Sequence, residues 1–79
     1  MHGTPIIRTL PKPKPVLSRR EREVLGWIAQ GKTARETSEV LSIAERTVEA
    51  HVNSAMRKLK AKTRTHAVAI ALRDRVIEF

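Results

Sequence analysis

TARETSEVLSIAERTVEAHVNSAMRKL, residues 33–59, is the stretch of sequence that decides the fold. Its first part carries a capping box, Thr33 with Glu36 three residues later, in which each side chain bonds the other residue's backbone N–H. A short helix is therefore predicted over residues 34–41. Its inward-facing residues are expected to be Thr37, Val40 and Leu41.

A longer helix is predicted over residues 45–59, and its two faces differ in chemistry. Its inward stripe recurs at steps of four, three and four residues, at Val48, Val52, Ala55 and Leu59. Its outer face carries long or hydrogen-bonding side chains and one small one: Arg46, Glu49, Ala50, Asn53 and Arg57. Because only residues 42–44 separate the two helices, the arrangement predicts a helix-turn-helix. In that motif the second helix enters the major groove of DNA, which is wide enough for one α-helix.

Helices are also predicted on either side of this motif. Ser18 and Glu21 form a second capping box and Gly31 offers a left-handed stop, so a helix is expected over about residues 19–30. Thr63 can cap a last helix that ends near Asp74. Its inward residues should include Ala67, Ile70 and Ala71, with Val76, Ile77 and Phe79 folding back as a cover. The prediction is an all-α fold, a compact four-helix bundle that contains the helix-turn-helix and occupies residues 17–79.

The composition indicates a small basic domain. The 79 residues fit a single domain, and Trp27 and Phe79 are its only aromatic residues, so the core must be largely aliphatic. Sixteen Lys and Arg against eight Asp and Glu give a net charge of +8, which makes a polyanion such as nucleic acid the first candidate partner. The chain lacks the run of about 18 apolar residues that a spanning helix needs, so no membrane partner is expected. A cytoplasmic location is expected instead.

No arrangement of residues in the sequence suggests catalysis or a cofactor. Cysteine is absent, and the three histidines are too scattered to indicate a metal site. No carboxylate pair, Ser-His-Asp arrangement or glycine-rich phosphate loop can be assembled, so the protein is expected not to be an enzyme and to need no cofactor.

Residues 1–16 differ from the rest because they hold all four prolines and alternate Lys with Pro between residues 11 and 15. Proline removes backbone donors, so this segment cannot be helical. It is expected to be a flexible linker in an extended, polyproline-like form, or simply a tail.

Five segments, taken in order and with their intervals, resemble the LuxR-type helix-turn-helix domain of bacterial transcription regulators. They are residues 17–25 (LSRREREVL), 28–33 (IAQGKT), 46–52 (RTVEAHV), 58–59 (KL) and 64–68 (RTHAV). The resemblance covers residues 16–78. It implies the C-terminal effector domain of a transcription factor of quorum-sensing or response-regulator type, with a sensing domain expected N-terminal to it in a full-length regulator.

The resemblance also implies partners. Double-stranded DNA with a two-fold symmetric site is the expected ligand, bound by a homodimer that pairs through the fourth helix, and RNA polymerase is a further candidate partner. On the residues alone, two interpretations of Val68, Ala69 and Leu72 remain open. They are either exposed for this pairing or complete the core.

Carried over position by position, the family's base-contacting positions fall on Glu49, Ala50 and Asn53. Asn53 can bond an adenine edge, Glu49 can accept from a cytosine amino group, and the Ala50 methyl can pack on a thymine methyl. The phosphate-contacting positions, which set register and not sequence, fall on Lys32, Thr33, Arg46, Thr47, Arg57 and Lys58. The run Arg57, Lys58, Lys60, Lys62 and Arg64, five cations in eight residues, is also expected to contact phosphate.

Three departures from the family pattern have physical consequences. Glu49 repels phosphate, so it must either contact a base or pair with Arg46 or Asn53 beside it. Ala44 stands where the family usually has a Ser or Thr cap, so the long helix should begin without a side-chain acceptor. Thr37 and Ser38 put hydroxyls in the short helix, and these need partners such as carbonyls one turn back.

A second class of function remains open from the sequence. A helical bundle of this kind can also be a protein-interaction or RNA-binding module that contacts the transcription machinery. An RNA-binding module would be expected to carry stacking aromatics on an exposed face, which this chain lacks.

Overall fold

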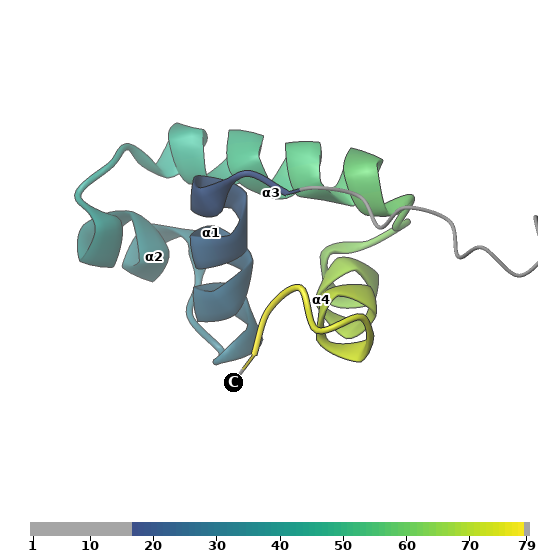
Figure 1. Cartoon of the computed structure of the whole chain (residues 1–79). Helices are drawn as coiled ribbons and strands as arrows, with labels where there is room; N and C mark the ends of the chain where they lie inside the picture. Colours follow the sequence, from purple (N-terminus) through teal and green to yellow (C-terminus); the bar gives the residue numbers. More distant parts are fainter. Residues whose placement is uncertain (1–16, 79) are drawn as a thin grey trace, which may run out of the picture.

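The computed structural model describes residues 17–78, which form four α-helices and no strand (Figure 1). The helices are α1 (Arg19–Ala29), α2 (Ala34–Leu41), α3 (Glu45–Leu59) and α4 (Arg64–Arg73). The predicted all-α fold is confirmed, and α2 and α3 have the predicted bounds. Two predictions concern residues outside the described range: residues 1–16 as a linker, and Phe79 as part of the cover. No helix between residues 17 and 78 has the length and hydropathy needed to cross a membrane.

Each of the four helices begins as its local sequence predicts. At α1 the Ser18 hydroxyl accepts from the Glu21 N–H at 3.1 Å, and the Glu21 carboxylate accepts from the Ser18 N–H at 2.8 Å. Thr33 and Glu36 make the same reciprocal pair at α2. Thr63 caps α4 through the His66 N–H. The Ala44 position before α3 has no side-chain cap, as predicted.

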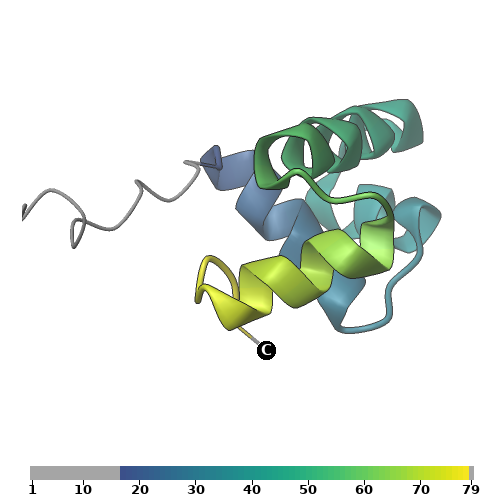
Figure 2. The same ribbon diagram turned by 90° about the vertical axis from the view of Figure 1, so that its right-hand side faces the viewer.

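Helix α3 lies across the other three helices. α1, α2 and α4 each pack against α3, whereas α2 and α4 do not contact each other within residues 17–78. In Figures 1 and 2, all three lie on the same side of α3, and no helix of residues 17–78 covers the opposite side. One face of α3 is therefore buried and the other faces away from the domain.

The core consists of two clusters on either side of α1. Leu17, Leu25, Ala55, Leu59, Ala67, Ala71 and Ile77 form the first, which joins α1, α3 and α4. Val24, Ala34, Val48 and Val52 form the second, which joins α1, α2 and α3. Met56 packs against both clusters. All four predicted inward residues of α3 are in these clusters, which confirms the orientation of that helix.

The predicted inward stripe of α2 is wrong at Val40, whose side chain is exposed. The buried residues of α2 are Ala34, Thr37 and Ser38, with Leu41 half-buried. Because these four positions follow the spacing i, i+3, i+4 and i+7, they make one helical face, and Val40 falls off it.

The chain after α4 folds back on the core. The N–H groups of Val76 and Ile77 both donate to the Ala71 carbonyl, at 2.8 and 3.3 Å. Ile77 is buried in the first cluster and Val76 packs against it. The predicted cover is thus confirmed for these two residues.

Candidate nucleic-acid interface

The outer face of α3 is the surface to which sequence analysis assigned DNA contacts. Arg46, Ala50, Asn53 and Arg57 are exposed there, and Glu49 is half-buried. Their spacing along a helix places them on the face opposite the buried Val48 and Val52. The face offers two cations, one carboxylate, one amide that both donates and accepts, and one methyl group, which are groups that can contact phosphates and base edges.

The turn before α3 sets the crossing of α2 and α3. Ser42 adopts the left-handed conformation (φ 57°) and the Ile43 N–H donates to the Ser38 carbonyl at 3.0 Å, which ends α2 at once. The Ala44 carbonyl then accepts from Thr47 and Val48, so α3 begins within three residues. This short link holds α3 in a fixed direction relative to α2.

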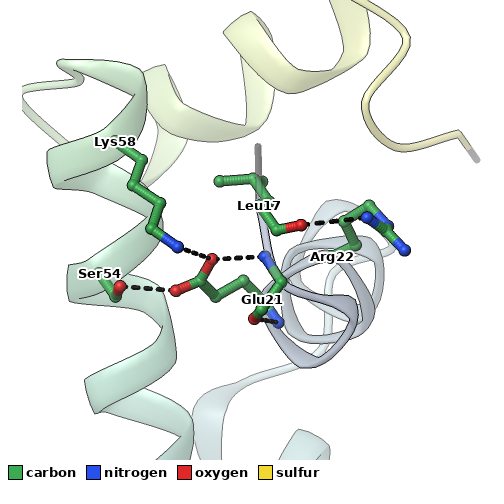
Figure 3. Close-up of polar contacts among 6 residues, drawn as sticks. Leu17, Glu21, Arg22, Ser54 and Lys58 are labelled. Atoms are coloured by element: carbon green, nitrogen blue, oxygen red, sulfur yellow. Dashed lines mark hydrogen bonds and ion pairs between the residues drawn. The ribbon is translucent and has the colours of Figure 1, made fainter. Parts of the chain in front are cut away.

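A polar contact that the sequence did not reveal joins α1 to α3 below the outer face (Figure 3). Ser54 donates its hydroxyl to Glu21 Oε2 at 2.5 Å, and Lys58 Nζ lies 2.9 Å from Glu21 Oε1. Figure 3 shows both side chains reaching from α3 toward the Glu21 carboxylate. Glu21 was recognised from the sequence only as half of a capping box. Its partners lie 33 and 37 residues away, so no local pattern pointed to them.

The buried Glu21 carboxylate remains ionised at neutral pH. Burial by itself would raise its pKa. Hydrogen bonds from the Ser54 hydroxyl, the Ser18 N–H and the Lys58 ammonium, together with the Lys58 charge, outweigh burial and lower the pKa from 4.5 to about 2. The Glu21–Lys58 pair is therefore a charged contact that fixes α3 against α1.

Glu49 pairs with a residue that the sequence analysis did not consider. Its Oε1 lies 2.5 Å from Nη2 of Arg64, the first residue of α4. Neither Arg46 nor Asn53, the two partners expected on α3 itself, is found bonded to Glu49 in the described part of the chain. The missed signal was the arginine at the start of the next helix, which sequence analysis had placed in the basic run.

The six predicted phosphate-contacting residues differ in exposure and in their ion pairs. Arg46 and Arg57 on α3 are exposed, and no ion pair holds either of them within residues 17–78. Lys58 is instead tied to Glu21. Near the start of α2, Lys32 is half-buried and Thr33 is exposed. Thr47 is half-buried in the first turn of α3.

The three residues suggested for pairing on α4 are not alike. Ala69 is exposed, whereas Val68 and Leu72 are half-buried and pack against the first core cluster. Val68 and Leu72 therefore contribute to the core and leave part of their surface outside, and pairing through α4 stays a prediction.

The two hydroxyls of α2 have different surroundings. Ser38 donates to the Arg35 carbonyl one turn back at 2.6 Å, as predicted. Thr37 is fully buried, and its hydroxyl has no hydrogen-bond partner among the described residues. The predicted back-bond is therefore found at Ser38 and not at Thr37. Among the same residues, no three His, Asp or Glu side chains gather as metal ligands.

These features define a class: a small helix-turn-helix domain with one uncovered face on its longer helix. The model of the family described as "Bacterial regulatory proteins, luxR family" matches residues 15–71. The chain therefore belongs to the luxR family of bacterial regulatory proteins. The family consists of DNA-binding transcription regulators and not of enzymes.

Individual relatives agree with this assignment. The transcriptional activator protein BjaR1 of Bradyrhizobium diazoefficiens is 49% identical over an alignment of 81 positions. The alignment covers 98% of this chain and 34% of BjaR1. RpaR of Rhodopseudomonas palustris, an HTH-type quorum sensing-dependent transcriptional regulator, is 54% identical over 84% of this chain and 29% of RpaR. The solved structure of the transcription factor GerE matches with a TM-score of 0.75 and 29% identity, over 78% of this chain and 92% of GerE. The chain spans about a third of the length of the first two relatives.

Proposed function

We propose that this chain binds double-stranded DNA in a sequence-specific way, as the C-terminal effector domain of a bacterial transcription regulator, with α3 in the major groove. The observation that carries the proposal is the division of α3. Val48, Val52 and Ala55 are fully buried on one side, while Ala50 and Asn53 are exposed on the other, which no helix of residues 17–78 covers (Figure 2). A helix of this kind fits a groove about 12 Å wide.

Charge supports the same ligand. The chain carries +8, and Arg46 and Arg57 lie near opposite ends of the outer face of α3. In the proposed complex these two contact phosphates on either side of the groove, with Lys32, Thr33 and Thr47 as further backbone contacts. Glu49, Ala50 and Asn53 contact base edges between them.

The wider proposal concerns assembly. Two copies pair through α4, with Ala69 and the outer parts of Val68 and Leu72 in the contact, on half-sites about one helical turn apart. Residues 17–79 form the DNA-binding domain, and residues 1–16 link it to a sensing domain in a full-length regulator. RNA polymerase is a further partner when the regulator is bound to its site.

The test is selection of bound duplexes from a random pool at stated salt, followed by titration of Asn53→Ala and Arg57→Ala on the selected and on an unrelated duplex. Asn53→Ala should weaken binding to the selected site by about five- to 150-fold and leave the unrelated duplex nearly unchanged. Arg57→Ala should weaken both and reduce the salt slope by about one.

One result would revise the predicted base contacts, and another would overturn the proposal. Equal losses on both duplexes for Asn53→Ala would remove Asn53 from the base-contacting set. Single-stranded RNA that competes as well as duplex DNA would instead favour an RNA-binding module.

A further inference from the structure

The outer face of α3 contains an acidic residue that is held from another helix. Glu49 Oε1 and Arg64 Nη2 lie 2.5 Å apart, although the residues are 15 positions apart in the sequence. The side chains are 42% and 39% exposed, so each keeps contact with solvent. The pair joins the middle of α3 to the first residue of α4.

An isolated carboxylate on this face would oppose the proposed function. DNA is a dense array of negative charge, so Glu49 is repelled unless a cation neutralises it. Pairs of exposed side chains contribute little in water. The same pair becomes stronger when a bound duplex excludes water, because the effective dielectric constant falls. The pair therefore forms in the free chain and becomes stronger in the complex, where the repulsion arises.

The geometry leaves one carboxylate oxygen available. Arg64 contacts Oε1, and within residues 17–78 no partner is found for Oε2 of Glu49. The backbone of Arg64 is held in place, because Thr63 caps α4 through the His66 N–H at 3.0 Å. A guanidinium on a fixed helix end restricts the rotamers of the side chain that it bonds. Oε2 is thus the oxygen left to accept a hydrogen bond, on a residue of the same helix face as Ala50 and Asn53.

We infer that Arg64 is a positioning residue for sequence recognition: it holds Glu49 so that Oε2 accepts from a base amino group at one position of the DNA site. The inference rests on the proposed function, because it assigns a role within the proposed major-groove complex. It separates Arg64 from the other cations of residues 57–64. Arg64 acts on sequence preference through Glu49, whereas an unpaired cation such as Arg57 acts on affinity for any duplex.

The experiment uses the 79-residue chain and four variants: Arg64→Gln, Glu49→Gln, their double variant, and Arg57→Gln as a control that removes the same charge. Each is put through duplex selection from a random pool, salt titration and thermal unfolding. Arg64→Gln and Glu49→Gln should lose preference at the same base pair, by about five- to tenfold. The double variant should lose no more than Glu49→Gln does there, because the two residues act as a unit. Arg57→Gln should keep that preference and reduce the salt slope by about one.

A second measurement needs no DNA. In the free chain, the ¹³C signal of the Glu49 carboxyl group should move on Arg64→Gln and stay in place on Arg57→Gln. An unchanged Glu49 signal in Arg64→Gln would show that the pair does not form in solution, and would overturn the inference whatever the binding data. Thermal unfolding identifies any variant that has lost its fold.

The outcomes also separate this inference from the proposed function. If the parent chain selects no sequence motif, the proposed function fails and the inference falls with it. If the parent chain selects a motif but Arg64→Gln only weakens all duplexes, as Arg57→Gln does, Arg64 is a phosphate contact. If Arg64→Gln and Glu49→Gln change preference at different base pairs, the two residues act separately. Either of the last two results refutes the inference alone.

Discussion

Replacement of Glu21 by Gln tests whether a charged contact fixes the candidate recognition helix α3 to the rest of the domain. Glu21 lies on α1, with its side chain 6% exposed, and it bonds Ser54 and Lys58 of α3. Gln has nearly the same shape and can still accept from the Ser18 N–H in the capping box. The substitution therefore removes the charge and leaves the local helix start in place.

The size of the effect follows from the pKa of Glu21. Burial opposes ionisation, but the hydrogen bonds and the Lys58 charge dominate and lower the pKa from 4.5 to about 2. At about 1.4 kcal/mol per tenfold change, this difference corresponds to about 3 kcal/mol of folding free energy. Because the folded-state pKa is lowered, this stability is fully present above about pH 4.5 and is lost as pH falls toward 2. A domain of this size has a stability of order 5 kcal/mol, so the contribution is a large part of the whole.

The assay is urea unfolding of the parent chain and of Glu21→Gln at several pH values between 6 and 2. We expect the parent to lose about 3 kcal/mol more than the variant over this interval, and the variant to be the less stable of the two at pH 6. The pKa of Glu36 is also lowered, by its hydrogen bonds with Thr33. Because Glu36 is present in both proteins, its contribution to the pH dependence cancels in the comparison. Glu23→Gln is the matched control, because its exposed pairs with Arg19 and Arg20 should contribute under about 1 kcal/mol.

Parallel pH dependences for the parent and Glu21→Gln would refute the reasoning. They would mean that Lys58 and Ser54 do not stabilise the ionised form of Glu21, and that the contact between α1 and α3 rests on apolar packing alone. A pH dependence that disappears in Glu23→Gln as well would assign the effect to the surface charge of α1 and not to its buried carboxylate.

Three further substitutions test other features of the fold by the same unfolding measurement. Thr37→Val should stabilise the domain by about 1 kcal/mol, because it replaces a buried hydroxyl that has no partner among the described residues, and a loss of stability would mean that the hydroxyl is bonded in solution. Ala44→Ser should add about 1 kcal/mol by capping α3, where an unchanged midpoint would indicate that the helix start is already satisfied. Lys60→Gly should add about 0.5 to 1 kcal/mol, because Lys60 ends α3 in the left-handed conformation (φ 56°), and a lower midpoint would contradict this strain.

The bounds of the helices could be predicted from the sequence because their signals are local. Capping boxes define the starts of α1 and α2, and the spacing of apolar residues defines the inner face of α3 within a dozen residues. The same spacing rule did not exclude Val40, because Thr37, Val40 and Leu41 also recur at i, i+3 and i+4. The face that packs against the core instead includes Ala34 and Ser38, and Val40 lies outside it.

The contacts that hold the candidate site could not be predicted in this way. Glu21 meets Ser54 and Lys58, and Glu49 meets Arg64, across separations of 15 to 37 residues. Such pairs depend on how helices cross, and the crossing is set by packing of the core. Sequence analysis placed Glu21 in a capping box and Lys58 and Arg64 in a basic run, but the partners of these side chains followed only from the assembled fold.

The assembled fold also divides the basic residues into two groups with different effects on DNA binding. Among the five cations of residues 57–64, Lys58 is tied to Glu21 and Arg64 to Glu49, while no ion pair within residues 17–78 holds Arg57, Lys60 or Lys62. The salt dependence of DNA binding reflects the phosphates that a protein neutralises. This segment should therefore contribute about three phosphate contacts to the salt slope and not five. Because Glu21 and Glu49 are each paired with a cation of the chain, Arg57, Lys60 and Lys62 can act on phosphate without opposition from those two carboxylates.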